Sequence, residues 1–537
     1  MATLSFKGKS FIQNYHLAVK YHELIPVKKK SLTNKVSLND NLIIHGDNLK
    51  ALKALLPTYA GKIKCIYIDP PYNTGNQNWV YNDNVNSPMM QEWLGKVVDK
   101  EDLTRHDKWL CMMMPRLKLL RELLSEDGVI CISIDDTEIS KLMELMDDSI
   151  FTEINKEEVI CWRRRHNQPN DKSKAISKVA EFIVVYAKNL DYLKLHHSFH
   201  GLPLTGDFSN PDNDPKGDWA SKPWKAGSNQ TGSRYTIITP TGKVLDEEWL
   251  GDEETYKAYL AEGRMYFPKS GDGLPRKKYY KFEREKEGQC AHNFWGHEEF
   301  GSNQEASEEI KELGIEFDNP KPTRLIKAIM TIFTNNDSIV LDSFAGSGTT
   351  AHAVLKLNKE DGGKRKFILV ECEDYADKTS AERVRRVIKG APTAKDDDLK
   401  KGLGGTFSFF ELGKPIELES ILEGHDLPSY MDLARYVFYT ATGDEFLPDK
   451  VDEDKHYIGE SKEYQVYLFY KPDIDYLKST ALTLEIAKGL GEYNGKKKLV
   501  FAPTKYLDLN DSELLAKHGL KDIEYCQLPF EIYRLRE

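Results

Sequence analysis

Apolar and polar residues alternate along the chain with two periods, and these periods predict where strands and helices lie. Short apolar runs at 42–45, 63–68 and 129–134 predict buried strands, and helical spacing of apolar residues predicts helices at 49–56 and 107–124. Pro115 lies inside the second helical stretch, so we expect it to kink or divide that helix. Strands that alternate with helices are typical of a parallel sheet covered by helices, which is an α/β fold.

The same alternation returns in a second block far downstream. Residues 338–358 predict a strand, a glycine turn and a helix, and residues 364–388 predict another strand and helix. A further buried strand is expected at 181–189. Residues 201–235 are rich in Gly, Pro, Asn, Asp and Trp and show little periodicity, which indicates surface loops. From residue 394 the charge-rich stretch TAKDDDLKKGLGG predicts a linker, and an α/β-like segment follows it.

Composition limits the class of protein. A chain of 537 residues is too long for one core, and 40% hydrophobic with 30% charged residues is typical of globular domains. No run of eighteen apolar residues occurs and the first residues lack the apolar core of a signal peptide, so we expect a soluble, cytoplasmic protein without a membrane segment. The seven cysteines contain no C-x-x-C pair, which argues against disulfides and a structural zinc site. His292 and His297 do not have a recognised ligand spacing either, so no metal is expected.

The stretch LDSFAGSGTTAHAV predicts a cofactor site at the carboxyl end of a strand. Gly346 and Gly348 would let the backbone approach a ligand closely, and the next strand ends in Glu371, where a carboxylate can accept both hydroxyls of a ribose. The loop lacks the Gly-Lys-Ser/Thr ending of a phosphate loop, so a nucleoside cofactor without a phosphate chain fits better. The alternative is a tight strand-to-helix turn without a ligand.

The stretch IYIDPPY predicts a site that holds an amine. The lone pair of an aromatic amine is delocalised, and two acceptors would help the nitrogen become tetrahedral: the Asp69 carboxylate and the Pro70 carbonyl. Pro70 and Pro71 fix the backbone there, because proline locks φ and restricts the residue before it. Tyr72 offers a flat face on which a base can stack. The alternative is a proline-rich turn at a strand end.

The net charge of -10 disfavours a polyanionic partner overall, but two local clusters favour DNA. Basic residues gather at 163–165, and basic and aromatic residues are interleaved at 276–286, on either side of the loop-rich stretch. The candidate DNA-binding residues are Arg163, Arg164, Arg165, Lys277, Lys278, Tyr279 and Tyr280. The alternative is a solvated charged face. Trp219, Trp224 and Trp295 are expected to be packing anchors.

D-P-P-Y together with F-A-G-S-G resembles the pair of motifs in the amino-methyltransferases that act on DNA. Since D-P-P-Y comes first here, the order is similar to that of the permuted β group of adenine-specific enzymes. The stretches WLCMMMPRLKLLRELL, FIVVYAKN, WGHEEFGSNQEASEEIKELG and CQLPFEIYRL resemble the modification (Mod) subunits of type III restriction-modification systems. The first thirty-five residues resemble nothing in this family.

The resemblance implies a doubly wound, mostly parallel, Rossmann-like sheet that transfers a methyl group from S-adenosylmethionine to the N6 amine of an adenine flipped out of the duplex. It implies catalytic roles for Asp69, Pro70, Pro71 and Tyr72, and no metal. The cofactor-binding residues that it implies are Asp47, Lys321, Pro322, Asp342, Phe344, Ala345, Gly346, Ser347, Gly348, Thr349 and Glu371. It also implies double-stranded DNA, a second copy of the chain and a helicase-nuclease restriction subunit as partners.

The resemblance also suggests how the chain divides into parts. We expect an N-terminal extension at 1–35, a catalytic half at 36–190, a target-recognition insertion at 191–315, a cofactor half at 316–393 and a C-terminal domain at 394–537. Residues 73–83, NTGNQNWVYND, are expected to form a loop that closes on the flipped base.

Three other functions stay open at this point. The chain could be a stand-alone amino-methyltransferase without a nuclease partner, including one that acts on cytosine, although such cytosine enzymes more often have serine where Asp69 stands. It could be a DNA-binding module without activity. Methylation of protein or RNA is the third, but glutamine methyltransferases more often begin this motif with Asn.

Overall fold

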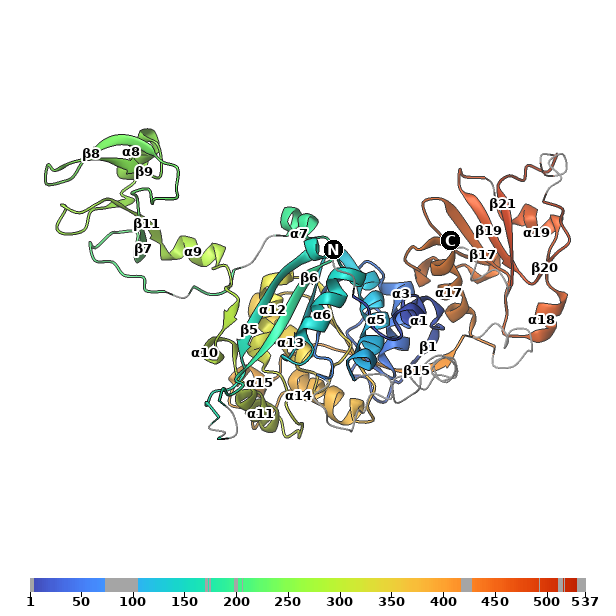
Figure 1. The fold of residues 1–537 in the computed structure, drawn as a ribbon. Coiled ribbons are helices and arrows are strands. Elements are labelled where there is room, and N and C mark those ends of the chain that lie inside the picture. The colour runs from blue at the N-terminus through green and yellow to red at the C-terminus, as the bar shows by residue number, and fades with distance from the viewer. Residues whose placement is uncertain are drawn as a thin grey trace. The chain divides into compact units, whose positions relative to one another are not determined.

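The computed structural model describes residues 4–72, 105–169, 172, 175–197, 201–204, 206–416, 427–491, 493–509, 515 and 517–528. The chain forms two compact units (Figure 1). The larger unit comprises Met1–His197 and Asn293–Glu537, and the smaller unit comprises Ser198–His292. Each unit is described by itself.

A sheet of ten strands, counted over the described residues, is the centre of the larger unit. Its order is β1 (His22–Pro26), β15 (Ser408–Pro415), β2 (Leu42–His45), β14 (Lys366–Glu371), β13 (Ile339–Asp342), β3 (Ile63–Ile68), β4 (Leu124–Ile134), β6 (Ala180–Ala187), β5 (Lys156–Arg163) and β12 (Phe294–Trp295). The six strands from β15 to β4 run parallel, while β1 and β6 are antiparallel to their neighbours. The sheet is therefore mixed but mostly parallel.

Helices flank this sheet on both faces, as Figure 1 shows, which confirms the α/β, doubly wound class. Alternate strand residues such as Leu42 and Ile44 pack with apolar residues of α3 (Asn48–Tyr59), α5 (Arg105–Leu123) and α6 (Ile139–Leu145). A second group of helices packs together and against β3 and β14: α12 (Thr323–Phe333), α13 (Thr349–Asp361) and α14 (Glu382–Lys389). The other helices of this part are α1 (Lys9–Ile12), α2 (Tyr15–Ala18), α7 (Leu190–His196), α10 (His297–Phe300), α11 (Asn303–Glu312) and α15 (Asp397–Lys401).

Of the two outcomes expected at Pro115, a kink or a division of the helix, the structure excludes division. Helix α5 runs through Pro115 without being divided. Its apolar residues, among them Leu117 and Leu120, are fully buried in the core, so packing outweighs the hydrogen bond that proline removes.

The main sheet also continues beyond residue 393. The stretch expected to be a linker contains α15. Its Leu399 side chain is buried, and the Leu399 carbonyl accepts from the Ala391 amide at 2.9 Å. Strand β15 follows and pairs with β2, and β1 from the first thirty-five residues pairs with β15. The phenylalanines of the run Phe407–Phe410 are buried, so this stretch belongs to the core of the main sheet, where β15 lies between β1 and β2.

The smaller unit has its own core, which contains Trp224, Ile237, Leu245, Trp249, Tyr256 and Met265. Its strands are β7 (Trp219–Pro223), β10 (Met265–Tyr266) and β11 (Arg276–Tyr280) in one antiparallel sheet, and β8 (Ser233–Ile238) with β9 (Val244–Trp249) in a hairpin. Its helices are α8 (Glu253–Ala261) and α9 (Lys281–Glu287). Trp219 and Trp224 are buried here and Trp295 is buried in the larger unit, as expected of packing anchors. The segment expected as an insertion, 191–315, is longer than this unit at both ends.

The C-terminal residues 430–527 form helices and strands that are separate from the main sheet. Their sheet has the order β16 (Tyr457–Glu460), β17 (Tyr464–Leu468), β19 (Lys497–Ala502) and β21 (Ile523–Gln527), and β18 (Ala481–Leu482) pairs with β20 (Thr504–Lys505). Their helices are α17 (Tyr430–Thr442), α18 (Ile474–Ser479) and α19 (Leu484–Gly489). Val466 and Leu468 belong to one apolar core and Tyr467 and Phe469 to another, because successive side chains of a strand point to opposite faces.

Within the part of the chain that the structure describes, no helix has the length and apolar character needed to cross a membrane.

Candidate active site

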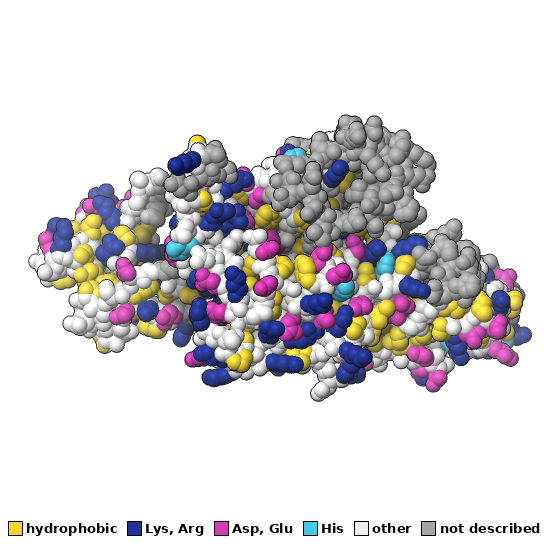
Figure 2. Space-filling model, turned by 90° about the horizontal axis from the view of Figure 1, so that it is seen from below, with side chains coloured by type: hydrophobic (Ala, Val, Ile, Leu, Met, Phe, Trp, Pro, Cys, Tyr) yellow, Lys and Arg dark blue, Asp and Glu magenta, His cyan; other side chains and the backbone are white. Residues whose placement is uncertain are grey.

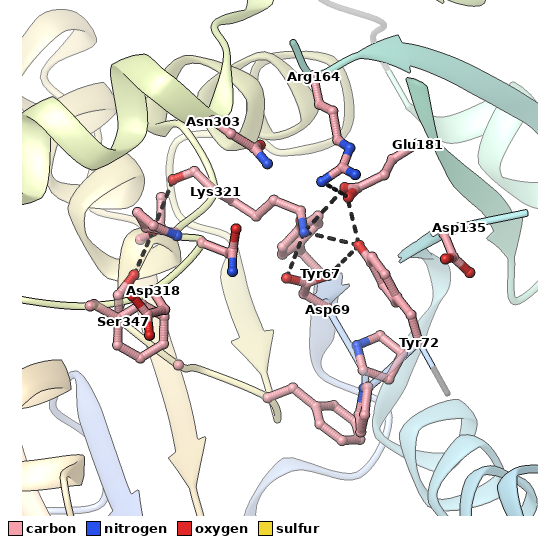
Figure 3. A pocket seen from close by; sticks show the side chains of 18 of the residues that line it. Tyr67, Asp69, Tyr72, Asp135, Arg164, Glu181, Asn303, Asp318, Lys321 and Ser347 are labelled. Atoms are coloured by element: carbon pink, nitrogen blue, oxygen red, sulfur yellow. Dashed lines mark hydrogen bonds and ion pairs between the residues drawn. The ribbon is translucent and has the colours of Figure 1, made fainter. Parts of the chain in front are cut away.

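The two sequence motifs meet at one edge of the main sheet. Strands β3 and β13 are parallel neighbours, with Cys65 opposite Val340 and Ile66 opposite Leu341. Asp69 follows β3 and Asp342 ends β13, so both lie at the carboxyl edge of the sheet. Ligands of open α/β sheets bind at such an edge, where the strand order reverses. A cavity of about 520 Å³ opens there, and residues of both motifs line it (Figure 3).

Asp69 and Tyr72 are joined to Lys321 by short contacts in this cavity. The Tyr72 hydroxyl donates to Asp69 Oδ1 at 2.6 Å, and Lys321 Nζ lies 2.7 Å from Asp69 Oδ2 and 2.9 Å from the Tyr72 hydroxyl. The ammonium also lies 5.1 Å from the centre of the Tyr72 ring. Lys321 precedes α12, 252 residues after Asp69, so the two halves of the sequence contribute to one site.

A second carboxylate, Glu181, completes this network. It lies at the amino end of β6, and Figure 3 shows it beside Lys321 and Tyr72. Its Oε2 is 3.4 Å from Lys321 Nζ and 3.3 Å from the Tyr72 hydroxyl, and its Oε1 is 3.0 Å from Arg164. Because β6 is antiparallel to β4, its amino end lies at the edge where the parallel strands end.

The charges of the network set the protonation states. Burial alone would lower the pKa of Lys321, but Asp69 and Glu181 outweigh it and raise that pKa. Burial, with the two carboxylates, holds the pKa of Tyr72 well above its usual range. At neutral pH Lys321 is therefore a cation and Tyr72 a neutral hydroxyl that can donate.

The two prolines after Asp69 are anchored from the side of α5. Pro70 and Pro71 both line the cavity, and Trp109 of α5 donates its indole N–H to the Pro71 carbonyl at 2.7 Å. Trp109 is fully buried, so this bond fixes the backbone that follows β3.

The glycine loop after β13 has the geometry that its sequence predicts. Gly346 and Gly348 have φ of 51° and 77°, in the left-handed region that favours glycine. A side chain at Gly348 would meet the Ser380 carbonyl at 3.0 Å, and one at Gly346 would meet the Phe317 ring at 3.3 Å. The loop residues that line the cavity are Phe344, Ala345, Gly346, Ser347 and Thr349.

A buried arginine supports the loop from behind. Arg383 of α14 donates to Ser347 Oγ at 3.1 Å and to Thr349 Oγ1 at 2.8 Å. Its other nitrogen lies 3.2 Å from Glu309 of α11. Thr349 in turn donates to the Lys321 carbonyl at 3.2 Å, so the loop is connected to the segment that carries the ammonium.

Asp342 and Glu371 are buried carboxyls that shape the loop. Asp342 accepts from the Phe344 amide at 3.0 Å and from the Thr350 hydroxyl at 2.6 Å, and Glu371 accepts from the amides of Gly346 at 2.7 Å and Glu373 at 3.0 Å. Burial raises the pKa of each to about 7, although these hydrogen bonds oppose the shift. Asp342 lines the cavity, whereas Glu371 lies behind Gly346.

Four residues assigned to the cofactor by resemblance lie outside the cavity lining: Asp47, Pro322, Gly348 and Glu371. Asp47 caps the amino end of α3, where it accepts from the Lys50 amide at 3.0 Å, and Pro322 is buried at the start of α12 against Gly301. Their contribution to cofactor binding stays a prediction. The expected closing loop, residues 73–83, lies outside the described residues.

The basic clusters are arranged differently from one another. Arg163 is half-buried and Arg165 is exposed, whereas Arg164 turns into the cavity and pairs with Glu181. In the smaller unit, alternate residues of β11 face opposite ways: Lys278 and Tyr280 are buried on Asp214, at 2.5 Å and 2.8 Å. Those two side chains are packing residues, which does not suit DNA contacts.

Lys277 and Tyr279 lie on the outer side of β11. Lys277 lies 3.8 Å from the centre of the Tyr259 ring and 5.3 Å from that of Tyr279. Lys and Arg side chains are interspersed with Asp and Glu over the face that Figure 2 shows, so DNA binding would depend on such local groups.

Among the residues that the structure describes, no three His, Cys, Asp or Glu side chains are grouped so that they could hold a metal ion. All seven cysteines, each within the described residues, are free thiols.

Several cavity residues had no motif to reveal them. Phe317 and Tyr375 form an edge-to-face pair at 5.6 Å beside the glycine loop, and Asn303 lines the cavity at the start of α11. Glu181 precedes its apolar run whereas Asp69 follows one, so only the antiparallel pairing of β6 with β4 brings the two carboxylates to the same edge of the sheet.

The class of protein that has this fold and cavity is named by comparison with known protein families. Residues 63–382, more than half of the chain, match the family model described as DNA methylase. The chain belongs to this DNA methylase family.

Its relatives narrow the class further. The StyLTI Mod subunit, of a type III restriction-modification enzyme of Salmonella typhimurium, is 34% identical over 74% of this chain and 65% of its own length. The EcoPI Mod subunit of Escherichia phage P1 is 31% identical over 72% of this chain and 68% of its own. The type II methyltransferase M.KpnI of Klebsiella pneumoniae is 30% identical over 65% of this chain and 84% of its own.

Within the family, the chain groups with the Mod subunits of type III restriction-modification enzymes. It spans less than two thirds of the length of the StyLTI subunit.

Proposed function

We propose that the chain is a site-specific DNA methyltransferase that uses S-adenosylmethionine to methylate the N6 amine of an adenine. One observation carries the proposal: Asp69, Pro70 and Tyr72 line the same cavity as Phe344, Gly346 and Ser347. An acceptor set for an amine and a glycine loop for a nucleoside therefore face each other, as a transfer between the two requires.

The residues on the cofactor side fit S-adenosylmethionine. The glycine loop is closely backed by Phe317 and Ser380, and Phe344, Asp342 and Ser347 line the cavity beside it. Phe344 offers a ring for the adenine part, and Asp342 lines the cavity as a carboxyl that can accept a hydroxyl. Glu371 ends the next strand behind Gly346, and we propose its role toward the ribose hydroxyls from its position at a strand end. When bound, this cofactor supplies an electrophilic methyl group.

The residues on the base side would hold and orient the amine. Asp69 and the Pro70 carbonyl would accept its two hydrogens, and Tyr72 would stack on the extruded base, since the amine is unreachable within the duplex. Lys321 holds Asp69 and Tyr72 in place through its ammonium. Positioning of this kind supplies a large part of such a rate.

The proposed DNA contacts are Arg163, Arg165, Lys277 and Tyr279, which are exposed or half-buried. Lys278 and Tyr280 are left out because they are buried, and Arg164 is assigned to the cavity. Alternation on β11 allows one side of the strand to pack and the other to meet DNA.

The partners are proposals that follow from the relatives. The StyLTI and EcoPI relatives are Mod subunits of type III enzymes, so we propose that this chain is the modification and recognition subunit of such an enzyme, with a restriction subunit as its partner. A homodimer is part of the same proposal.

Incubation of the full chain with labelled S-adenosylmethionine and a pool of duplex DNA tests the activity. We expect label in the DNA with the wild-type chain and none with Asp69→Asn. Cofactor binding without any label in DNA from either protein would overturn the proposal.

A stand-alone DNA methyltransferase is the second candidate, favoured by the match to M.KpnI over 84% of that protein. Co-purification of the tagged chain from its host separates the two candidates. A stoichiometric helicase-nuclease would support the Mod assignment, and its absence from a fully active preparation would support the stand-alone enzyme.

A further inference from the structure

Glu181 is a buried carboxylate in the cavity that the mechanism above does not use. The residue is 4% exposed, at the amino end of β6, and it has no counterpart in the two sequence motifs. Its Oε2 faces both the Tyr72 hydroxyl and Lys321 Nζ, at 3.3 Å and 3.4 Å, and its Oε1 faces Arg164.

The Tyr72 hydroxyl stands between Glu181 and Asp69. It has one hydrogen and two carboxylate acceptors, at 2.6 Å on Asp69 and 3.3 Å on Glu181. Lys321 donates to the same oxygen at 2.9 Å, which leaves the hydroxyl hydrogen for one carboxylate or the other. A small shift of this hydrogen exchanges its acceptor.

We propose that Glu181 is the final acceptor of a proton relay that runs from Asp69 through Tyr72. The proposal rests on the proposed function. As a carbon–nitrogen bond forms, the carbon–sulfur bond of the methyl donor breaks and its electron pair stays on sulfur, so the methylated amine carries one proton too many. The N–H bond breaks toward Asp69, the Tyr72 oxygen takes that proton, and the hydroxyl passes its own hydrogen to Glu181.

The surroundings of Glu181 suit this role. Its charge is matched by two cations, Lys321 and Arg164, so the ionised carboxylate is compensated while it waits for the proton. Lys178 and Asp136, which also line the cavity, are paired with each other.

Single-turnover methylation of a duplex with the mapped target tests the relay. The variants are Glu181→Gln, Tyr72→Phe and the double variant, and Glu158→Gln, an exposed glutamate on β5, is the matched control. We expect Glu181→Gln to slow transfer about a hundredfold, within the range of general acid–base catalysis, while Glu158→Gln has no effect. Because both residues act in one chain of transfers, Tyr72→Phe should add little to Glu181→Gln.

Three readouts separate the relay from a loss of structure. Affinity for the cofactor and the fluorescence of 2-aminopurine at the target position should be unchanged in Glu181→Gln, and the slowing of wild-type transfer in heavy water should be lost. Transfer by Glu181→Gln at the rate of Glu158→Gln, or fully additive effects in the double variant, would overturn the relay alone. No transfer by the wild-type chain would instead contradict the proposed function itself.

Discussion

Tyr72 combines two chemical groups that substitution can separate. Its hydroxyl belongs to the network of Asp69, Lys321 and Glu181, while its ring is the surface on which the extruded base is proposed to stack.

We expect Tyr72→Ala to weaken binding to duplex with the target by about 1–3 kcal/mol, the scale of one base–aromatic contact. Tyr72→Phe keeps the ring and should keep this affinity. Titrations that compare DNA with and without the target measure the difference. Equal losses in Ala and Phe variants would mean that the ring does not stack on the base.

If Glu371 accepts the ribose hydroxyls as proposed, we expect cofactor binding to depend on pH. Burial raises its pKa to about 7, so the carboxyl is neutral below that pH and ionised above it. Since an ionised carboxylate is the stronger acceptor for ribose hydroxyls, affinity for S-adenosylmethionine should increase as the pH rises from 6 to 8. Calorimetric titration over this range measures it, and Glu371→Gln should bind weakly with a flat profile. A flat wild-type profile would contradict the assignment of Glu371 to the cofactor.

At the scale of elements, the turn between β13 and α13 tests whether the glycines are needed for conformation or for close approach. Gly348 begins α13 with φ of 77°, and Gly362 ends it with φ of 72°. A side chain at Gly348 would meet the Ser380 carbonyl at 3.0 Å, whereas one at Gly362 would meet nothing within 4 Å.

Both Gly348→Ala and Gly362→Ala should therefore lose about 1–2 kcal/mol for the left-handed conformation. Gly348→Ala should lose more stability and also cofactor affinity, because the loop must shift from Ser380. Thermal unfolding and cofactor titration of both variants measure this. If Gly362→Ala reduced cofactor affinity as much as Gly348→Ala, the close approach would not be the cause.

The elements that the sequence predicts well are those with a local signal. The apolar run 63–68 is strand β3 with the same bounds, and the run 42–45 is β2. The edge of the sheet could not be predicted in this way, since β1 and β15 pair although most of the chain lies between them. The helix expected at 107–124 is α5, but Pro115 does not divide it, because burial of the surrounding residues outweighs the local effect of proline.

The site shows the same limit. The two motifs indicated Asp69, Tyr72 and the glycine loop because each motif is contiguous. The contacts of Lys321 with Asp69 and Glu181 join residues from three separate strands and loops, which only the folded sheet brings together. Lys278 was assigned to DNA because its neighbours in sequence are basic and aromatic, whereas its side chain is buried on Asp214.

At the scale of the whole molecule, the proposed recognition of DNA by a chain with net charge -10 would depend on a few outward cations. Lys277→Ala should lower DNA affinity and reduce the slope of log affinity against log salt by about 1, as expected for one lost phosphate contact. Lys257→Ala is the control, since Lys257 is an exposed lysine of the same unit that pairs with Glu253. Binding titrations at several salt concentrations give both slopes. Equal slopes for the two variants would remove Lys277 from the interface.

The two motifs are proposed to form one site that methylates adenine at N6. The most direct measurement is nucleoside analysis by mass spectrometry of duplex DNA incubated with S-adenosylmethionine and either the wild-type chain or Asp69→Asn. We expect N6-methyladenine from the wild-type chain and none from the variant. Methylcytosine in its place, or equal N6-methyladenine from both proteins, would contradict the account.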